Sequence, residues 1–369
     1  MSYRIISADC HLDMNWLPPD TFTARAPASM KDRVPHVEET SEGIKYWFVK
    51  GKQMWGSRVG WYGPGVNGGK RGELLVKEGF TKGDLRCSDY QMRKADQVRD
   101  GVDAEVVYGI LAVDRSIPDK PVLEATYKAY NDFVSEWQQH DTDWLIPLAE
   151  IPNHDGTVAA EEVCRAKEIG LRGAEFAPAT MAKPLWDDEW VPLWEAVEDT
   201  QLSLSFHAFN ISTTFSESEH PAAAGANLVL APSRADEVLC TLVLSGLLER
   251  HPRAKMILGE SGIGWIPYML ERLDYSYDRR LGDLNLPLMP SEYFKRQVYA
   301  TYIQDYWGTK AMWELGYLDN IMWSTDYPHR DSTWPESKEN VEKTFGGLPE
   351  EVKKACVHDN VVRIYGLSE

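Results

Sequence analysis

Two pairs of carboxylate and imidazole side chains stand at short spacing near opposite ends of the chain. Asp9 and His11 are two residues apart, and Asp326 precedes His329 by three residues. In a β-strand, side chains at positions i and i+2 point the same way, so Asp9 and His11 would project together. Carboxylates and imidazoles that converge on one point are ligand types of Zn²⁺, Mn²⁺ or Fe²⁺. Either pair alone could also be a turn-forming aspartate beside a structural histidine.

Two further polar residues end apolar runs in the middle of the chain. His207 follows residues 202–206, and Glu260 follows residues 255–259. A single histidine at a strand end is more often structural than a ligand. Enzymes built on parallel sheets, however, place their reactive groups outside the carboxyl ends of the strands. A parallel sheet would therefore bring these distant residues to one edge.

An alternation of apolar runs and helical patterns predicts such a sheet. The predicted strands are residues 3–8, 104–109, 144–149, 171–176, 202–206, 255–259, 297–301 and the run that begins at residue 321. Eight strands separated by helices predict a (β/α)8 barrel, an α/β fold. The segment from about residue 15 to 88, rich in Trp and Gly, is expected to be an insertion over the barrel mouth. We expect residues 1–369 to form one domain.

A barrel would place the polar residues at the strand ends around a single cavity. The five that end strands one, five, six and eight are Asp9, His11, His207, Glu260 and Asp326. Such a set predicts a metal site that keeps an open position for water. The ion would lower the pKa of that water to about 7, and a weakly ligating carboxylate such as Asp326 could then accept its proton.

Composition and charge exclude several classes of partner. Of the 369 residues, 43% are hydrophobic and 26% are charged, which is ordinary for a globular protein. The net charge of −18 argues against nucleic acid and anionic membranes as partners. The five cysteines are far apart and lack CxxC spacing, so they fit reduced thiols better than disulfides or a zinc finger. Without a leader-like or membrane-spanning apolar run, we expect a cytoplasmic enzyme that acts on a small molecule.

Six short motifs connect these residues to a known family. They are residues 9–11 (DCH), 99–104 (RDGVDA), 206–207 (FH), 259–268 (GESGIGWIPY), 323–329 (WSTDYPH) and 360–366 (NVVRIYG). Together they resemble the amidohydrolase superfamily, in the branch of aminocarboxymuconate semialdehyde decarboxylase and the resorcylate decarboxylases. The resemblance implies metal ligands at His11, His207 and Asp326, and at Asp9, where relatives carry His or Glu. It also implies a homodimer.

The chain departs from this family in two places. Known decarboxylases of the branch carry a histidine near Glu260 that helps to activate the metal-bound water or the substrate, and this chain has none there. No lysine ends the fourth strand to bridge two ions; Arg172 and Glu175 stand there, as pocket groups or as a core ion pair. Glu260 could be a general base, a hydrogen-bond partner of a ligand, a ligand of a second ion or an anchor of its loop. His329 could support Asp326 or orient the substrate.

These departures lead to two enzymatic hypotheses and one alternative. The leading hypothesis is a metal-dependent hydrolase of a small amide, ester, thioester or lactone, with Asp326, Glu260 and His329 as catalytic residues. We expect zinc first, with manganese or iron as alternatives, and one ion or two. The second hypothesis is a metal-dependent non-oxidative decarboxylase of an aromatic or unsaturated carboxylic acid. A non-catalytic binding protein on a barrel scaffold would leave the convergence of carboxylates and histidines unexplained.

Overall fold

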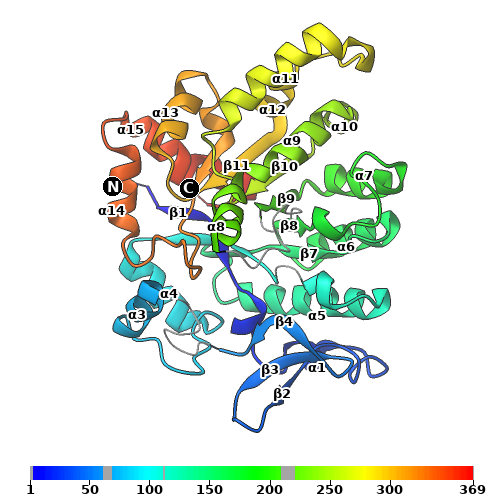
Figure 1. Cartoon of the computed structure of the whole chain (residues 1–369), viewed down its shortest axis with the longest axis vertical. Coiled ribbons are helices and arrows are strands. Elements are labelled where there is room, and N and C mark those ends of the chain that lie inside the picture. Colours follow the sequence, from blue (N-terminus) through cyan, green and yellow to red (C-terminus); the bar gives the residue numbers. More distant parts are fainter. Residues whose placement is uncertain (1–2, 61–68, 111–112, 209–220, 369) are drawn as a thin grey trace.

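The protein is a (β/α)8 barrel, as predicted. The computed structural model describes residues 3–60, 69–110, 113–208 and 221–368, and Figure 1 shows strands in the middle of the molecule with helices outside them. The barrel strands are β1 (Ile6–His11), β5 (Ala104–Tyr108), β6 (Leu145–Pro147), β7 (Ala149–Ile151), β8 (Gly173–Phe176), β9 (Ser203–His207), β10 (Lys255–Gly259), β11 (Val298–Tyr302) and β12 (Ile321–Trp323). All paired neighbours are parallel, and β6 and β7 are two pieces of one strand interrupted at Leu148.

Backbone hydrogen bonds close the barrel between its last strand and its first. The amide of Asp326 donates to the carbonyl of Asp9 (2.9 Å), and the amide of His11 donates to the carbonyl of Tyr327 (2.7 Å). These bonds carry β1 as far as His11, beyond its predicted end at residue 8. Asp9 and His11 therefore lie within the strand and not in the loop after it.

Helices lie outside the barrel strands (Figure 1). They are α4 (Tyr90–Asp100), α5 (Lys120–Gln138), α6 (Gly156–Glu168), α7 (Val191–Thr200), α9 (Ala235–Leu244), α10 (Leu247–Arg250), α11 (Ile266–Arg280), α12 (Pro290–Gln297), α13 (Tyr306–Glu314), α14 (Ser337–Phe345), α15 (Glu350–Lys354) and α16 (Asn360–Tyr365), with α8 (Pro221–Leu230) before α9. Gly246 adopts a left-handed conformation (φ 71°) between α9 and α10 and so separates these two helices. Among the helices that the structure describes, none has the length and apolar character needed to cross a bilayer.

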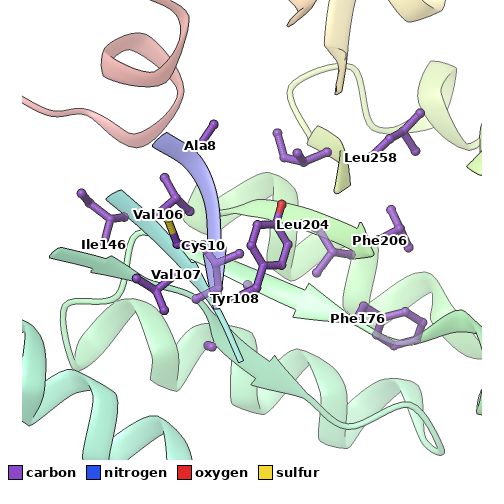
Figure 2. Packing of buried hydrophobic residues seen from close by; sticks show 14 of the residues in the cluster. Ala8, Cys10, Val106, Val107, Tyr108, Ile146, Phe176, Leu204, Phe206 and Leu258 are labelled. Atoms are coloured by element: carbon purple, nitrogen blue, oxygen red, sulfur yellow. The ribbon is translucent and has the colours of Figure 1, made fainter. Parts of the chain in front are cut away.

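The barrel interior is closely packed beneath the strand ends. Tyr108 at the end of β5 donates its hydroxyl hydrogen to Ser205 Oγ across the barrel (3.3 Å). Gly259 ends β10 where a Cβ atom would lie 3.0 Å from the Tyr108 hydroxyl and 3.1 Å from the His207 ring. The missing side chain thus leaves room for a tyrosine and a histidine. Figure 2 shows Tyr108 among apolar side chains of other barrel strands, with Cys10 of β1 and Leu204 of β9 near it.

A buried arginine supports the first strand from outside the barrel. Arg93 of α4 is fully buried and forms a two-pronged ion pair with Glu105 of β5, at 2.6 and 2.9 Å. Its Nη1 also donates to the carbonyl of His11 (2.9 Å) and to that of Cys87 (3.0 Å). Because a planar guanidinium can serve several acceptors at once, one side chain ties α4, β5 and the end of β1 together.

The predicted insertion contains a small antiparallel sheet of its own. It consists of β2 (His36–Glu39), β3 (Lys45–Val49) and β4 (Lys52–Arg58) in the order β2–β3–β4, with α1 (Thr21–Arg25) before it and α3 (Gly69–Lys77) after it. α1 packs on α5, and Figure 1 shows the sheet below α5. Residues 61–68 of the insertion lie outside the described part of the chain. The expectation that the segment covers the barrel mouth stays a prediction, as does the single domain.

Candidate metal centre

The carboxylate of Asp9 is held so that only one oxygen faces the cavity. Its Oδ2 accepts hydrogen bonds from the Thr301 hydroxyl (2.7 Å) and the Glu260 amide (2.9 Å). Its Oδ1 is buried, receives no hydrogen bond from the described residues, and lies 3.3 Å from His11 Nε2. The side chain of Thr301 in β11 and the amide of Glu260, directly after β10, therefore fix the orientation of this carboxylate. Asp9 is poised to offer a single donor oxygen.

His207 enters the same cluster from the end of β9. Its Nε2 lies 3.8 Å from Asp9 Oδ1 and 3.3 Å from Glu260 Oε2. Its ring meets the His11 ring edge to face, with the centroids 4.9 Å apart. One nitrogen of His207 thus points toward the carboxylate oxygen that His11 also approaches.

Asp326 completes the cluster from the loop after β12. Its Oδ1 lies 3.2 Å from His11 Nε2, and its side chain is 1% exposed. Asp326 and Glu260 both adopt left-handed backbone conformations, with φ of 56° and 47°. Such conformations are costly for residues with a Cβ atom and recur at functional sites, where the surroundings hold them in place.

These side chains fit a divalent metal ion. Donor atoms of Asp9, His11 and His207 lie within 4.8 Å of one another, and so do donor atoms of a second group that contains His11, Glu260, Asp326 and His329. Charged groups this deeply buried need a partner, and a cation among two imidazoles and several carboxylate oxygens would supply it. The structure thus brings all six predicted residues together. Their roles as ligands and catalytic groups stay predictions.

His329 lies at the edge of the cluster between two carboxylates. Its Nδ1 is 2.9 Å from Asp326 Oδ1, and its Nε2 is 2.8 Å from Asp13 Oδ2. The ring stacks on the ring of His11, with the centroids 3.8 Å apart and the planes at 21°. Burial lowers the pKa of His329, but the charges of Asp326 and Asp13 raise it well above its ordinary value. The sequence alone did not single out Asp13, although Asp13 follows His11 by two residues, just as His11 follows Asp9.

The cluster perturbs the proton affinities of its members. Burial raises the pKa of Asp9, yet contacts with His11 and His207 hold it below its usual range. Burial lowers the pKa of His11, but contacts with Asp326 and Asp9 raise it more, to about 9. Burial and the charge of Asp326 raise the pKa of Glu260 well above its ordinary value. A cation that binds here would displace protons, so its affinity would depend on pH.

The two residues expected at the fourth strand separate. Arg172 turns away from the site, and its Nη1 lies 3.5 Å from the carbonyl of Gly366. Glu175 is buried inside the barrel and accepts a hydrogen bond from the Gly109 amide (3.3 Å). The two do not form a core ion pair, because they point to opposite sides of the strand.

Glu150, which sequence reasoning missed, lies beside Glu175 on the adjacent strand. The two residues are register partners of β7 and β8. Glu150 is 4% exposed, and its Oε1 receives no hydrogen bond from the described residues. Burial, and then the charge of Glu175, raise the pKa of Glu150 well above 4.5. The pair therefore favours a bound proton in the folded protein.

Replacing Glu150 by Gln should stabilise the protein, and more so at higher pH. A carboxyl whose pKa is raised by folding loses stability as the pH climbs from its unfolded pKa toward its folded one. Each unit of raised pKa costs about 1.4 kcal/mol above that window, and the neutral amide does not pay it. Urea unfolding at pH 5 and pH 9 would measure the difference, with exposed Glu136→Gln as the control. A Glu150→Gln protein that gains nothing between these two pH values would contradict the raised pKa.

Comparison with known proteins agrees with the motifs and the fold. A family model described as Amidohydrolase matches residues 82–367. The gamma-resorcylate decarboxylase of Rhizobium radiobacter is 30% identical over 288 residues, which cover 69% of this chain and 84% of that protein. An amidohydrolase from Mycobacterium avium subsp. paratuberculosis superposes with a TM-score of 0.75 at 18% identity, over 99% of this chain and 100% of that one. A 5-carboxyvanillate decarboxylase of Novosphingobium aromaticivorans with bound manganese gives 0.71 at 16% identity, over 99% and 98%.

The leading expectation of a hydrolase is wrong, because the relatives matched by sequence are decarboxylases. Those matches include gamma-resorcylate decarboxylases and a 2-amino-3-carboxymuconate-6-semialdehyde decarboxylase of Dictyostelium discoideum. The expectation depended on the missing histidine near Glu260. In the structure the carboxylate of Glu260 itself reaches His207, at 3.3 Å, so an ionisable group still occupies that side of the cavity. A missing histidine is therefore no argument against decarboxylation.

The family match, the sequence relatives and the fold all lead to one assignment. The matched region contains five of the six motifs completely and covers every barrel strand except β1. The chain belongs to the amidohydrolase family, in the branch that contains gamma-resorcylate decarboxylase.

Proposed function

We propose that this chain is a metal-dependent decarboxylase that removes the carboxylate of a small aromatic acid without oxidation. One observation carries the proposal: a gamma-resorcylate decarboxylase is 30% identical to this chain over 84% of its own length. The buried cluster of carboxylates and imidazoles at the barrel mouth supports it. Expected ligand atoms are Asp9 Oδ1, His11 Nε2, His207 Nε2 and Asp326 Oδ1.

We propose manganese as the ion, in place of zinc. Carboxylate oxygens from Asp9, Asp326 and Glu260 meet two imidazole nitrogens here, and oxygen-rich sites suit manganese better than thiolate-rich ones do. The 5-carboxyvanillate decarboxylase with the same fold holds manganese. When bound, the ion would hold the substrate carboxylate and a neighbouring oxygen and would withdraw electron density from them.

The reaction replaces a carbon–carbon bond by a carbon–hydrogen bond. The ring carbon that bears the carboxylate takes up a proton, the bond to the carboxylate carbon breaks, and its electron pair restores the aromatic ring as carbon dioxide leaves. We assign the proton to Asp326, because its Oδ2 is not an expected ligand atom, is buried and receives no hydrogen bond from the described residues. Asp9 is the weaker candidate, because its Oδ2 already accepts two hydrogen bonds.

A substrate panel tests the proposal. Protein loaded with manganese is incubated with 2,6-dihydroxybenzoate, 5-carboxyvanillate and related hydroxybenzoates, and separately with simple esters and lactones. We expect one carbon dioxide and one decarboxylated arene per molecule of aromatic acid consumed, with the arene identified by chromatography. Ester or lactone hydrolysis without carbon dioxide release from any acid would reject the proposal. The homodimer, the single domain and the cytoplasmic location stay predictions, and light scattering of the purified protein would check the first.

A further inference from the structure

The imidazole of His329 is fixed from three directions. One ring nitrogen faces Asp326 Oδ1 at 2.9 Å, and the other faces Asp13 Oδ2 at 2.8 Å. The third constraint is the stacked ring of His11. A flip of the imidazole would turn ring carbons toward both carboxylates, so the three contacts select a single orientation.

Asp13 is the member of this chain of contacts that stands nearest to solvent. Its side chain is 26% exposed, that of His329 is 24% exposed, and that of Asp326 is 1% exposed. Asp13 lies two residues after the end of β1 and has an extended backbone, with φ −69° and ψ 166°. The strand that carries Asp9 and His11 therefore also delivers the carboxylate that holds His329 from outside.

We propose that Asp13 is a positioning residue, which orients His329 and through it the carboxylate of Asp326. Asp326 Oδ1 has two neighbouring imidazoles, His11 Nε2 at 3.2 Å and His329 Nδ1 at 2.9 Å. Asp13 binds the far nitrogen of this second imidazole and so helps to hold it beside Asp326. This inference rests on the proposed metal centre and not on the identity of the reaction.

A purely structural role for Asp13 would have different consequences. An ion pair between partly exposed side chains contributes about 0–1 kcal/mol to folding, and its loss would leave the affinity for metal unchanged. Hydrogen-bond partners that orient metal ligands behave otherwise, since their removal typically lowers metal affinity or activity by about 10- to 100-fold. Metal affinity therefore distinguishes the two roles.

The test compares Asp13→Leu and Asp13→Asn with a matched control. The control is Glu124→Leu, because Glu124 contacts His154 at 3.0 Å with similar exposure, 28% and 10% for the two side chains. Manganese binding to metal-free protein is measured by calorimetry, and kcat and KM are measured separately on any acid that is turned over. We expect Asp13→Leu to lose about 10- to 100-fold in manganese affinity and in kcat, with KM changed little. Asp13→Asn should recover most of the loss, because its amide oxygen still accepts from the imidazole.

The outcomes separate this inference from the proposed function. Asp13→Leu with the manganese affinity of Glu124→Leu would overturn the positioning role, as would an Asn variant no better than Leu. Should Asp13→Leu fail to fold, Asp13→Asn is compared with Glu124→Gln in the same measurements. Equal manganese affinity and equal kcat in these two variants would then overturn the positioning role, and a smaller but measurable loss in Asp13→Asn alone would support it. A wild-type protein that decarboxylates nothing would reject the proposed function, while the calorimetric series would still decide on Asp13.

Discussion

Stripping the protein of divalent ions with a chelator should abolish its activity and weaken its fold. Without the cation, two buried carboxylates and two imidazoles face one another at 3.2 to 3.8 Å with nothing to neutralise the acids except protons. We expect activity to fall more than about 10³-fold, as is usual when an essential Lewis acid is lost. An ion present at 1,000 times its Kd stabilises the native state by about 4 kcal/mol, which a melting curve would show as a lower Tm in the stripped protein.

Metal binding should also weaken as the pH falls. His11 has a pKa of about 9 in the metal-free protein, so the ion must displace a proton throughout the neutral range. The apparent Kd for manganese should therefore rise as the pH drops from 9 to 6.

Activity of the stripped protein should return when manganese is added back, whereas magnesium, which prefers an octahedron of oxygens, should restore less activity. Full activity at less than about a tenth of an equivalent of metal would contradict the metal centre.

Replacing Asp326 by Asn should separate metal binding from proton transfer. The amide oxygen can still serve as a ligand, but the amide cannot carry the proton that the ring carbon needs. Because general acid catalysis typically contributes about 10²- to 10⁴-fold, we expect kcat to fall by that factor while most of the metal remains bound. Steady-state kinetics and elemental analysis on the same sample would measure both quantities.

The control for this variant is Asp331→Asn, a change of an exposed carboxylate in the same loop. It should leave kcat and metal content near the wild-type values. An Asp326→Asn protein that keeps its metal and its full kcat would show that the proton comes from another group, with Glu260 as the next residue to change.

The strands could be predicted from the sequence because they are short, largely apolar runs, and four of them lead into the polar residues of the site. The end of β1 could not, because the amide of His11 donates to the carbonyl of Tyr327, a residue of the loop after the last strand. Such pairing leaves no local signal. The break of the third strand at Leu148 was not predicted either, because residues 144–149 form an uninterrupted apolar run, which is typical of one continuous strand.

The residues of the site could be predicted from the sequence, but the contacts between them could not. Alternation along β1 and the polar strand ends indicated the six candidate residues. Asp13 and His329 are 316 residues apart, so only the fold reveals their contact. Glu150 follows an apolar run in the sequence, and nothing there indicates that it would lie beside Glu175 on the adjacent strand. The reaction class was predicted wrongly because the sequence shows that a histidine is missing but not how far Glu260 reaches.

The seam between β1 and β12 has a consequence for the order in which this protein matures. The seam joins the first and last strands of the barrel, as the bond from the Thr325 amide to Ser7 Oγ shows, 318 residues apart. During translation the N-terminal strand leaves the ribosome long before its partner exists. The ligand atoms of Asp9 and His11 are therefore synthesised long before those of Asp326, which can join the cluster only when almost the whole chain has been made. A nascent chain therefore cannot capture its ion early, and loading with metal becomes a late event that follows closure of the barrel.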